Sequence, residues 1–103
     1  MFGTVARMVM KPAAEPLLQA WTGAFTRPVA GLVSTTIYRS RDEANVFWLC
    51  VVFESEEAYR ANSTSPEQHR RWQQLRSVLD ADPEWHDGDV VVSHAPDGTN
   101  SGA

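Results

Sequence analysis

The sequence predicts a single α+β domain of the ferredoxin-like class, with an antiparallel sheet and the element order β-α-β-β-α-β. The first observation is length, because a chain of 103 residues is rarely divided into two cores. The second is composition, since 43% hydrophobic and 21% charged residues are ordinary for a folded globular protein. The third is periodicity, which switches between strand and helix spacing along the chain. We expect one domain over residues 1–95 and a flexible polar tail over residues 96–103.

The first third of the chain predicts a strand followed by a helix. Residues 2–11 alternate in the manner of a strand, and one face carries Phe2, Thr4, Ala6, Met8 and Met10. Apolar residues at helical spacing then predict a helix over residues 14–26, with Leu17, Leu18, Trp21 and Phe25 on one side. The segment from Pro28 to Gly31 is expected to end it.

The middle of the chain predicts two more strands, over residues 32–39 and 45–54, joined by a turn at residues 40–43. The third strand is apolar on both faces. In the usual strand order of this fold, 4-1-3-2, the first and third strands are central. Two helices form one layer and cover one face of the sheet, so a second cover is required. We expect a homodimer in which two sheets pack face to face.

Two helix starts follow the third strand. Ser55 is a candidate N-cap for a short helix that runs through Asn62. Ser65 is a candidate N-cap for a second helix, with Pro66 at its first position and Gln68 completing a capping box. This second helix is expected to end near residue 80.

The end of the domain is rich in acidic residues. The Asp-Gly pair at residues 87–88 favours a turn, and the valines after it predict a final strand over residues 89–95. One histidine lies among the carboxylates of this cluster, which consists of Asp82, Glu84, His86, Asp87 and Asp89. Its spacing matches neither an EF-hand loop nor a two-histidine zinc site, so no metal is expected.

Charge and cysteine content exclude several classes of protein. The net charge of −4 argues against nucleic acid or an anionic membrane as partner. A single cysteine, Cys50, excludes a disulfide scaffold and a CxxC site. The longest apolar run, residues 46–53, is far shorter than a membrane span, and the N-terminus does not resemble a secretory signal. We therefore expect a cytoplasmic protein.

Four stretches resemble the antibiotic biosynthesis monooxygenase domain family. FESEEAYRAN at residues 53–62 resembles the family's strand-to-helix junction, and SPEQ at residues 65–68 and EWHDGD at residues 84–89 extend the match. VAGLVS at residues 29–34 resembles the entry to the second strand, with Ala30 where proline is common. The resemblance covers roughly residues 1–95.

The resemblance implies a dimeric α+β barrel with a pocket between sheet and helices in each subunit. The best-understood family members oxidise polycyclic phenols or quinols with O₂ and without metal or flavin, because an electron-rich phenolate or enolate reduces O₂ itself. The expected function is a cofactor-independent monooxygenase of quinol-like or polyketide-like aromatic molecules. Such a protein must supply an apolar slot, donors for the developing oxyanion and a proton acceptor.

Three residues are candidates for catalysis. Asn62 aligns with the polar helix position that similar oxygenases place near the substrate oxygen, although Asn also commonly ends a helix. His69 is a candidate base, with a solvated histidine beside two arginines as the alternative. The family's tryptophan one turn after the asparagine is replaced by Pro66, and Trp72 is the substitute candidate or a core residue.

Four residues are candidates for substrate binding. Tyr38 and Trp48 either wall a planar ligand or fill the barrel. Tyr59 either donates a hydrogen bond from its hydroxyl or is a half-buried helix residue. Arg7 either orients an anionic substrate or pairs with Glu54, and we favour the pair.

Two other functions remain open from the sequence. The first is a non-catalytic dimeric domain that binds a small ligand or assists another protein, which the missing tryptophan favours. The second is haem degradation, which requires an axial histidine facing the pocket.

Overall fold

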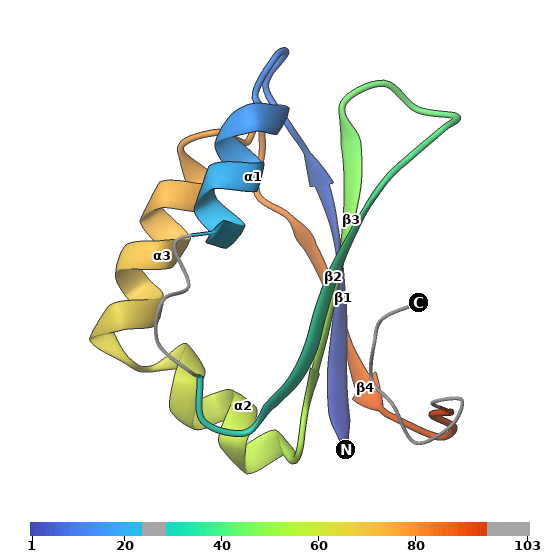
Figure 1. Cartoon of the computed structure of the whole chain (residues 1–103), viewed down its shortest axis with the longest axis vertical. Helices are drawn as coiled ribbons and strands as arrows, with labels where there is room; N and C mark the ends of the chain where they lie inside the picture. The colour runs from blue at the N-terminus through green and yellow to red at the C-terminus, as the bar shows by residue number, and fades with distance from the viewer. Residues whose placement is uncertain (24–28, 95–103) are drawn as a thin grey trace.

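The protein folds as a four-stranded antiparallel sheet with its helices on one face, in a computed structural model that describes residues 1–23 and 29–94 (Figure 1). The elements in chain order are β1 (Phe2–Val9), α1 (Glu15–Gly23), β2 (Leu32–Arg39), β3 (Val46–Phe53), α2 (Glu56–Ser63), α3 (Pro66–Arg76) and β4 (Glu84–Asp89). The strand order is β2-β3-β1-β4, so β1 and β3 are central, as predicted. The ferredoxin-like class is confirmed.

The alternation predicted for β1 separates a buried face from a half-exposed one. Phe2, Thr4, Ala6 and Met8 point towards the helices and are buried, and Ala6 and Met8 have no exposed surface. The core formed with Leu75 and the other residues beneath α1 and α3 lies between the sheet and the helices. A ligand bound between the sheet and the helices would therefore contact the face of β1 that carries Thr4 and Ala6.

The third strand is apolar on both faces, and the structure covers them unequally. Phe47, Leu49 and Phe53 are buried on the helix side. Trp48 lies on the opposite face, where no described helix covers the sheet, and is only half-buried (Figure 1). Tyr38, opposite Trp48 in the register of β2 and β3, is 59% exposed.

Both predicted helix caps are confirmed. The Ser55 side chain accepts a hydrogen bond from the Ala58 amide at 3.1 Å, and Ser65 accepts one from the Gln68 amide at 3.1 Å. These caps begin α2 and α3 at positions that the sequence specifies. Because Thr64 and Ser65 separate the two helices, the end of α2 and the first turn of α3 lie next to each other.

A glycine in the loop before β2 allows this loop to pack closely against α2. Gly31 has φ +78°, a left-handed conformation that side chains rarely adopt, and its carbonyl accepts a hydrogen bond from the Glu54 amide at 2.8 Å. A Cβ atom added to Gly31 would lie 2.6 Å from the Cβ of Ala58. The loop before β2 therefore approaches α2 as closely as a glycine allows.

The prediction for the last strand was wrong. The strand runs over Glu84–Asp89 rather than residues 89–95, and the predicted turn at residues 87–88 lies inside it. Asp87 is opposite Thr4 and Gly88 is opposite Gly3 in the antiparallel pairing of β4 with β1. This pairing keeps the backbone of the polar segment extended. Pairing with a neighbouring strand here outweighs the turn preference of Asp-Gly.

Other boundaries differ in smaller ways. The helix predicted to reach residue 80 ends at Arg76, and Leu79 instead forms an isolated bridge with Met10. The described part of α1 ends at Gly23, and the rest of the predicted helix lies outside the described residues, as does the predicted tail at 96–103. No helix in the described parts of the chain is long and apolar enough to cross a membrane.

The expected pair between Arg7 and Glu54 was also wrong. Arg7 forms ion pairs with Glu43 at 2.5 Å and with Glu84 at 3.7 Å. Glu54 follows Phe53, which is opposite Phe2 at the far end of β1, so it lies away from Arg7. The observed ion pairs are partly exposed, and each contributes at most about 1 kcal/mol to the free energy of unfolding.

Candidate active site

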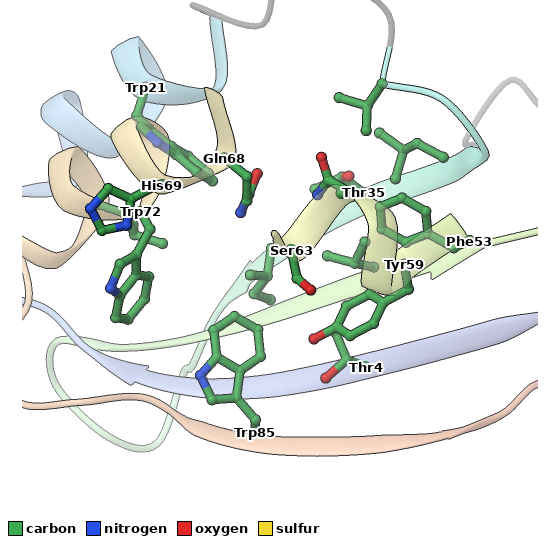
Figure 2. Close-up of a pocket in the computed structure, with 16 residues that line it drawn as sticks. Thr4, Trp21, Thr35, Phe53, Tyr59, Ser63, Gln68, His69, Trp72 and Trp85 are labelled. Atoms are coloured by element: carbon green, nitrogen blue, oxygen red, sulfur yellow. The ribbon is translucent and has the colours of Figure 1, made fainter. Parts of the chain in front are cut away.

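A cavity of about 260 Å³ lies between the sheet and the helices (Figure 2). Its lining is mostly apolar, with a few polar groups. The lining residues are Thr4, Trp21, Val29, Leu32, Thr35, Leu49, Val51, Phe53, Tyr59, Asn62, Ser63, Gln68, His69, Trp72, Leu75 and Trp85. Since an apolar cavity of roughly 150 Å³ holds one benzene molecule, this one has room for a small fused-ring compound. Few polar groups in an apolar cavity are typical of a ligand site.

The junction between α2 and α3 supplies most of the polar lining. Asn62 and Ser63 come from the end of α2, and Gln68 and His69 come from the first turn of α3. The break after α2 turns the chain so that both helix ends face the cavity. Carboxamide, hydroxyl and imidazole groups are thereby collected on one wall.

Tryptophan side chains form a second wall. The rings of Trp72 and Trp85 lie 6.3 Å apart between centroids, with an interplanar angle of 53°. The indole N–H of Trp21 donates a hydrogen bond to the Arg71 carbonyl at 3.0 Å, which ties α1 to α3. Trp85 is 44% exposed and lies at the edge of the cavity. These rings offer flat apolar surface to a planar ligand.

A tyrosine occupies the part of the cavity nearest β1 and β4. The Tyr59 ring lies 5.0 Å from Phe2 and 5.6 Å from Phe53, so aromatic contacts on two sides fix its orientation. Burial raises the pKa of the Tyr59 hydroxyl, and the charge of Asp87 raises it further. Arg60 and a hydrogen bond with Thr4 act on the pKa in the opposite direction. The hydroxyl therefore stays protonated at neutral pH.

The structure brings four of the predicted site residues together in the cavity: Tyr59, Asn62, His69 and Trp72. The other three, Arg7, Tyr38 and Trp48, do not line it. Arg7 and Tyr38 are each opposite Trp48 in the strand pairing, which puts all three on the face turned away from the helices. Any contact that they make with a ligand would belong to a different surface.

Twelve of the sixteen lining residues were not anticipated as site residues, and the tryptophan and amide side chains among them are Trp21, Gln68 and Trp85. Trp21 was predicted only to lie on the apolar side of the first helix, and Trp85 lay outside every predicted helix and strand. Gln68 was interpreted only through its place in the capping box; its backbone amide donates to the Ser65 cap, and its side chain lines the cavity. Trp85 lies opposite Ala6 in the pairing of β1 with β4, and no local pattern in the polar segment 84–89 would have placed it there.

The acidic cluster near the C-terminal end is divided by its strand. Because side chains alternate along β4, Glu84 and His86 lie on one face and Asp87 lies on the other. Within residues 1–23 and 29–94, no three His, Cys, Asp or Glu side chains gather where they could hold a metal ion.

The model of the antibiotic biosynthesis monooxygenase family matches residues 1–75. The chain belongs to this family. Solved structures with the same fold include a protein from Chloroflexus aurantiacus assigned to the antibiotic biosynthesis monooxygenases, with 20% identity and a TM-score of 0.77 over 91% of this chain and 96% of that one. They also include SnoaB, a cofactor-independent oxygenase from Streptomyces nogalater, with 21% identity and a TM-score of 0.73 over 89% of this chain and 94% of that one. No curated protein matches this family member by sequence.

Proposed function

We propose that this protein is a cofactor-independent monooxygenase of quinol-like or polyketide-like aromatic compounds. The observation that carries the proposal is the cavity, in which Asn62 and His69 face a space walled by aromatic rings. Membership of the family supports the reaction class. The fold shared with SnoaB, which is described as a cofactor-independent oxygenase, is consistent with it.

The chemistry requires a proton acceptor and a donor for the resulting oxyanion. An imidazole ring nitrogen can accept a proton, so His69 is the proposed acceptor for the proton of an acidic phenol or enol. The Asn62 carboxamide N–H then donates a hydrogen bond to the oxyanion. The electron-rich anion reduces O₂, one oxygen atom enters the substrate as a carbonyl in place of two hydrogens, and the other leaves as water.

The walls favour this reaction in two ways. Trp72 and Trp85 hold a flat substrate so that one edge faces the polar helix junction. Apolar surroundings also exclude water, which strengthens the hydrogen bond from Asn62 to a developing charge.

Oxygen consumption by metal-free protein tests the proposal, with anthrone or a dihydroquinone as substrate. Asn62→Ala is expected to lower kcat about 100- to 1,000-fold, the usual loss on removing one oxyanion donor. Gln73→Ala is the matched control, because Gln73 is exposed on α3 and does not line the cavity. Equal rates in the wild type and Asn62→Ala would refute the role of Asn62, and no uptake with any such substrate would refute the function.

A non-catalytic binding domain is the second candidate, favoured by Pro66 at the first position of α3 where similar oxygenases place a tryptophan. It predicts that an aromatic ligand binds and is recovered unchanged after incubation in air. Haem degradation is a third candidate, since His69 lines the cavity. A haem titration without a shift of the Soret band would exclude it.

We also propose that the protein assembles as a homodimer through the sheet face opposite the helices. Trp48, Cys50 and Val52 lie half-buried on that face of β3. Beyond β4, Val91 and Val92 are 91% and 83% exposed, which adds uncovered apolar surface. Light scattering at micromolar concentration should give twice the mass of the chain, and a monomer would contradict the assembly.

A further inference from the structure

The Gln68 side chain is directed to the cavity rather than to the cap that begins α3. In a capping box, the side chain at the third helical position accepts a hydrogen bond from the backbone amide of the capping residue. Here the Ser65 amide donates instead to the Asn62 carbonyl oxygen at 3.0 Å. The Gln68 side chain lines the cavity on its α3 side (Figure 2). The helix cap therefore does not account for this carboxamide.

An arginine determines which way the carboxamide faces. The Nη1 atom of Arg71 donates a hydrogen bond to the Oε1 atom of Gln68 at 3.2 Å. Because a guanidinium group only donates, the atom that faces it must be the oxygen, and the Nε2 atom is turned away from Arg71. Figure 2 shows this nitrogen directed towards the middle of the cavity. Within the described residues, no group accepts a hydrogen bond from it, so its N–H groups are presented to a ligand.

Arg71 is itself held by neighbours on α3 and α1. Its side chain is only 18% exposed, and its Nη2 atom donates to a Glu67 carboxylate oxygen at 3.4 Å. Glu67 and Gln68 precede Arg71 by four and three residues, so one helical face carries all three. The Arg71 carbonyl accepts the indole N–H of Trp21 at 3.0 Å. The donor on Gln68 is therefore held at a fixed position in the cavity wall.

The arginine also makes Gln68 a stronger donor. A cation bonded to the oxygen of an amide draws electron density from its nitrogen, and hydrogen bonds in such a chain polarise one another. Trp21 and Trp72 place apolar ring surface on the same side of the cavity (Figure 2). A ligand without an acceptor would leave the N–H groups unpaired beside this surface, which costs binding free energy.

A ring carbonyl is the group that matches this donor. A carbonyl oxygen only accepts, whereas a hydroxyl group brings a proton that needs an acceptor of its own. It also lies in the plane of its rings, and Trp72 and Trp85 offer flat surface to a planar ligand. Removal of the proton from the enol form of such a ketone leaves negative charge on the same oxygen, where a polarised donor stabilises it.

We propose that Gln68, oriented by Arg71, donates a hydrogen bond to a ring carbonyl oxygen of the bound aromatic compound, and so selects cyclic aromatic ketones over the corresponding hydrocarbons. This inference rests on the proposed function, since it takes the cavity to bind planar aromatic compounds. It adds a second carboxamide donor to Asn62. Gln68 is thus a specificity-determining residue, and Arg71 is the positioning residue that fixes and polarises its donor.

Binding of paired probes under nitrogen separates this inference from turnover. The probes are 1-indanone and indane, which differ in one ring carbonyl, and calorimetry measures their dissociation constants. Wild-type protein should bind indanone more tightly than indane. Gln68→Met keeps the length of the side chain without its donor, so indanone binding should weaken about two- to tenfold and indane binding should not weaken. Gln73→Met is the matched control, because Gln73 is exposed on α3 and does not line the cavity.

The carbonyl stretching frequency of bound indanone gives a second readout, which reports the hydrogen bond itself. Because a hydrogen bond to the carbonyl oxygen lowers this frequency, the infrared band should lie below its position in an apolar solvent. The shift should be lost in Gln68→Met and in Gln68→Glu, whose carboxylate only accepts. Arg71→Met should reduce the shift, and Arg71→Lys, which keeps a cation, should restore part of it.

The outcomes distinguish this inference from the proposed function. Equal binding of the two probes by the wild type, or a preference and a carbonyl band that Gln68→Met leaves unchanged, would overturn the role of Gln68 even if the protein consumes oxygen. Failure of both probes to bind would overturn it as well. An unchanged band in Arg71→Met would overturn the positioning role of Arg71. The predicted preference and band shift without oxygen uptake would support the donor and refute the monooxygenase.

Discussion

Replacing Gly31 with alanine tests whether the close packing of the loop before β2 against α2 positions the helix. The helix carries Tyr59 and Asn62. Two costs are expected. The left-handed conformation of Gly31, with φ +78°, costs a non-glycine residue about 1–2 kcal/mol. The new Cβ would lie 2.6 Å from the Cβ of Ala58, and such overpacking costs about 1–3 kcal/mol. The free energy of unfolding should therefore fall by about 2–5 kcal/mol.

Urea denaturation measures this loss, and two further variants separate its causes. Gly88→Ala is the matched control, because a Cβ at Gly88 meets nothing within 4 Å and its φ is not left-handed. In the background of Ala58→Gly, Gly31→Ala should cost only the conformational part, about 1–2 kcal/mol. If Gly31→Ala is no more destabilising than Gly88→Ala, the close approach of the loop to α2 is not what positions the helix.

Two further changes have defined outcomes. Ser65→Ala removes the cap that accepts the Gln68 amide, so urea denaturation should show a loss of about 1 kcal/mol, and a loss below 0.3 kcal/mol would contradict the capping role. In a Tyr38→Phe background, where Tyr59 is the remaining tyrosine, phenolate absorbance should appear above the ordinary pKa of 10, and Asp87→Asn should lower the midpoint. Because the folded-state pKa is the higher one, stability from this group is present below pH 10 and is lost as pH rises through the folded value. A midpoint unchanged in Asp87→Asn would contradict the electrostatic coupling.

Much of the fold follows from local patterns in the sequence. The second strand, Leu32–Arg39, was predicted to the residue, because β-branched residues and the flanking turns mark both of its ends. Ser55 and Ser65 marked the helix starts through capping chemistry. The last strand was not predicted at residues 84–89, because this segment is polar and contains Asp-Gly. It is extended because it pairs with β1, which its own sequence does not indicate.

The site residues on a single helix could be predicted from the sequence. Those on strands could not, because their positions depend on how the strands pair. Tyr59 and Asn62 are three residues apart, so one helical face presents both to the cavity. The third strand is apolar on both faces, and its sequence does not tell which face meets the helices. Trp48 was therefore predicted as a candidate site residue, whereas Leu49, Val51 and Phe53, on the other face of β3, line the cavity. Which face of β3 meets the helices depends on its register with β1, and this long-range pairing cannot be inferred from a short segment alone.

The most direct test of the central claim is the fate of oxygen in a reaction catalysed by metal-free protein. Anthrone is incubated with the wild type under ¹⁸O₂ after removal of metal by a chelator, and the product is examined by mass spectrometry. A single labelled oxygen in the product, with the product formed much more slowly by Asn62→Ala than by Gln73→Ala, is the result we predict. Unlabelled product, or turnover that appears only when a metal or flavin is added, would contradict a cofactor-independent monooxygenase.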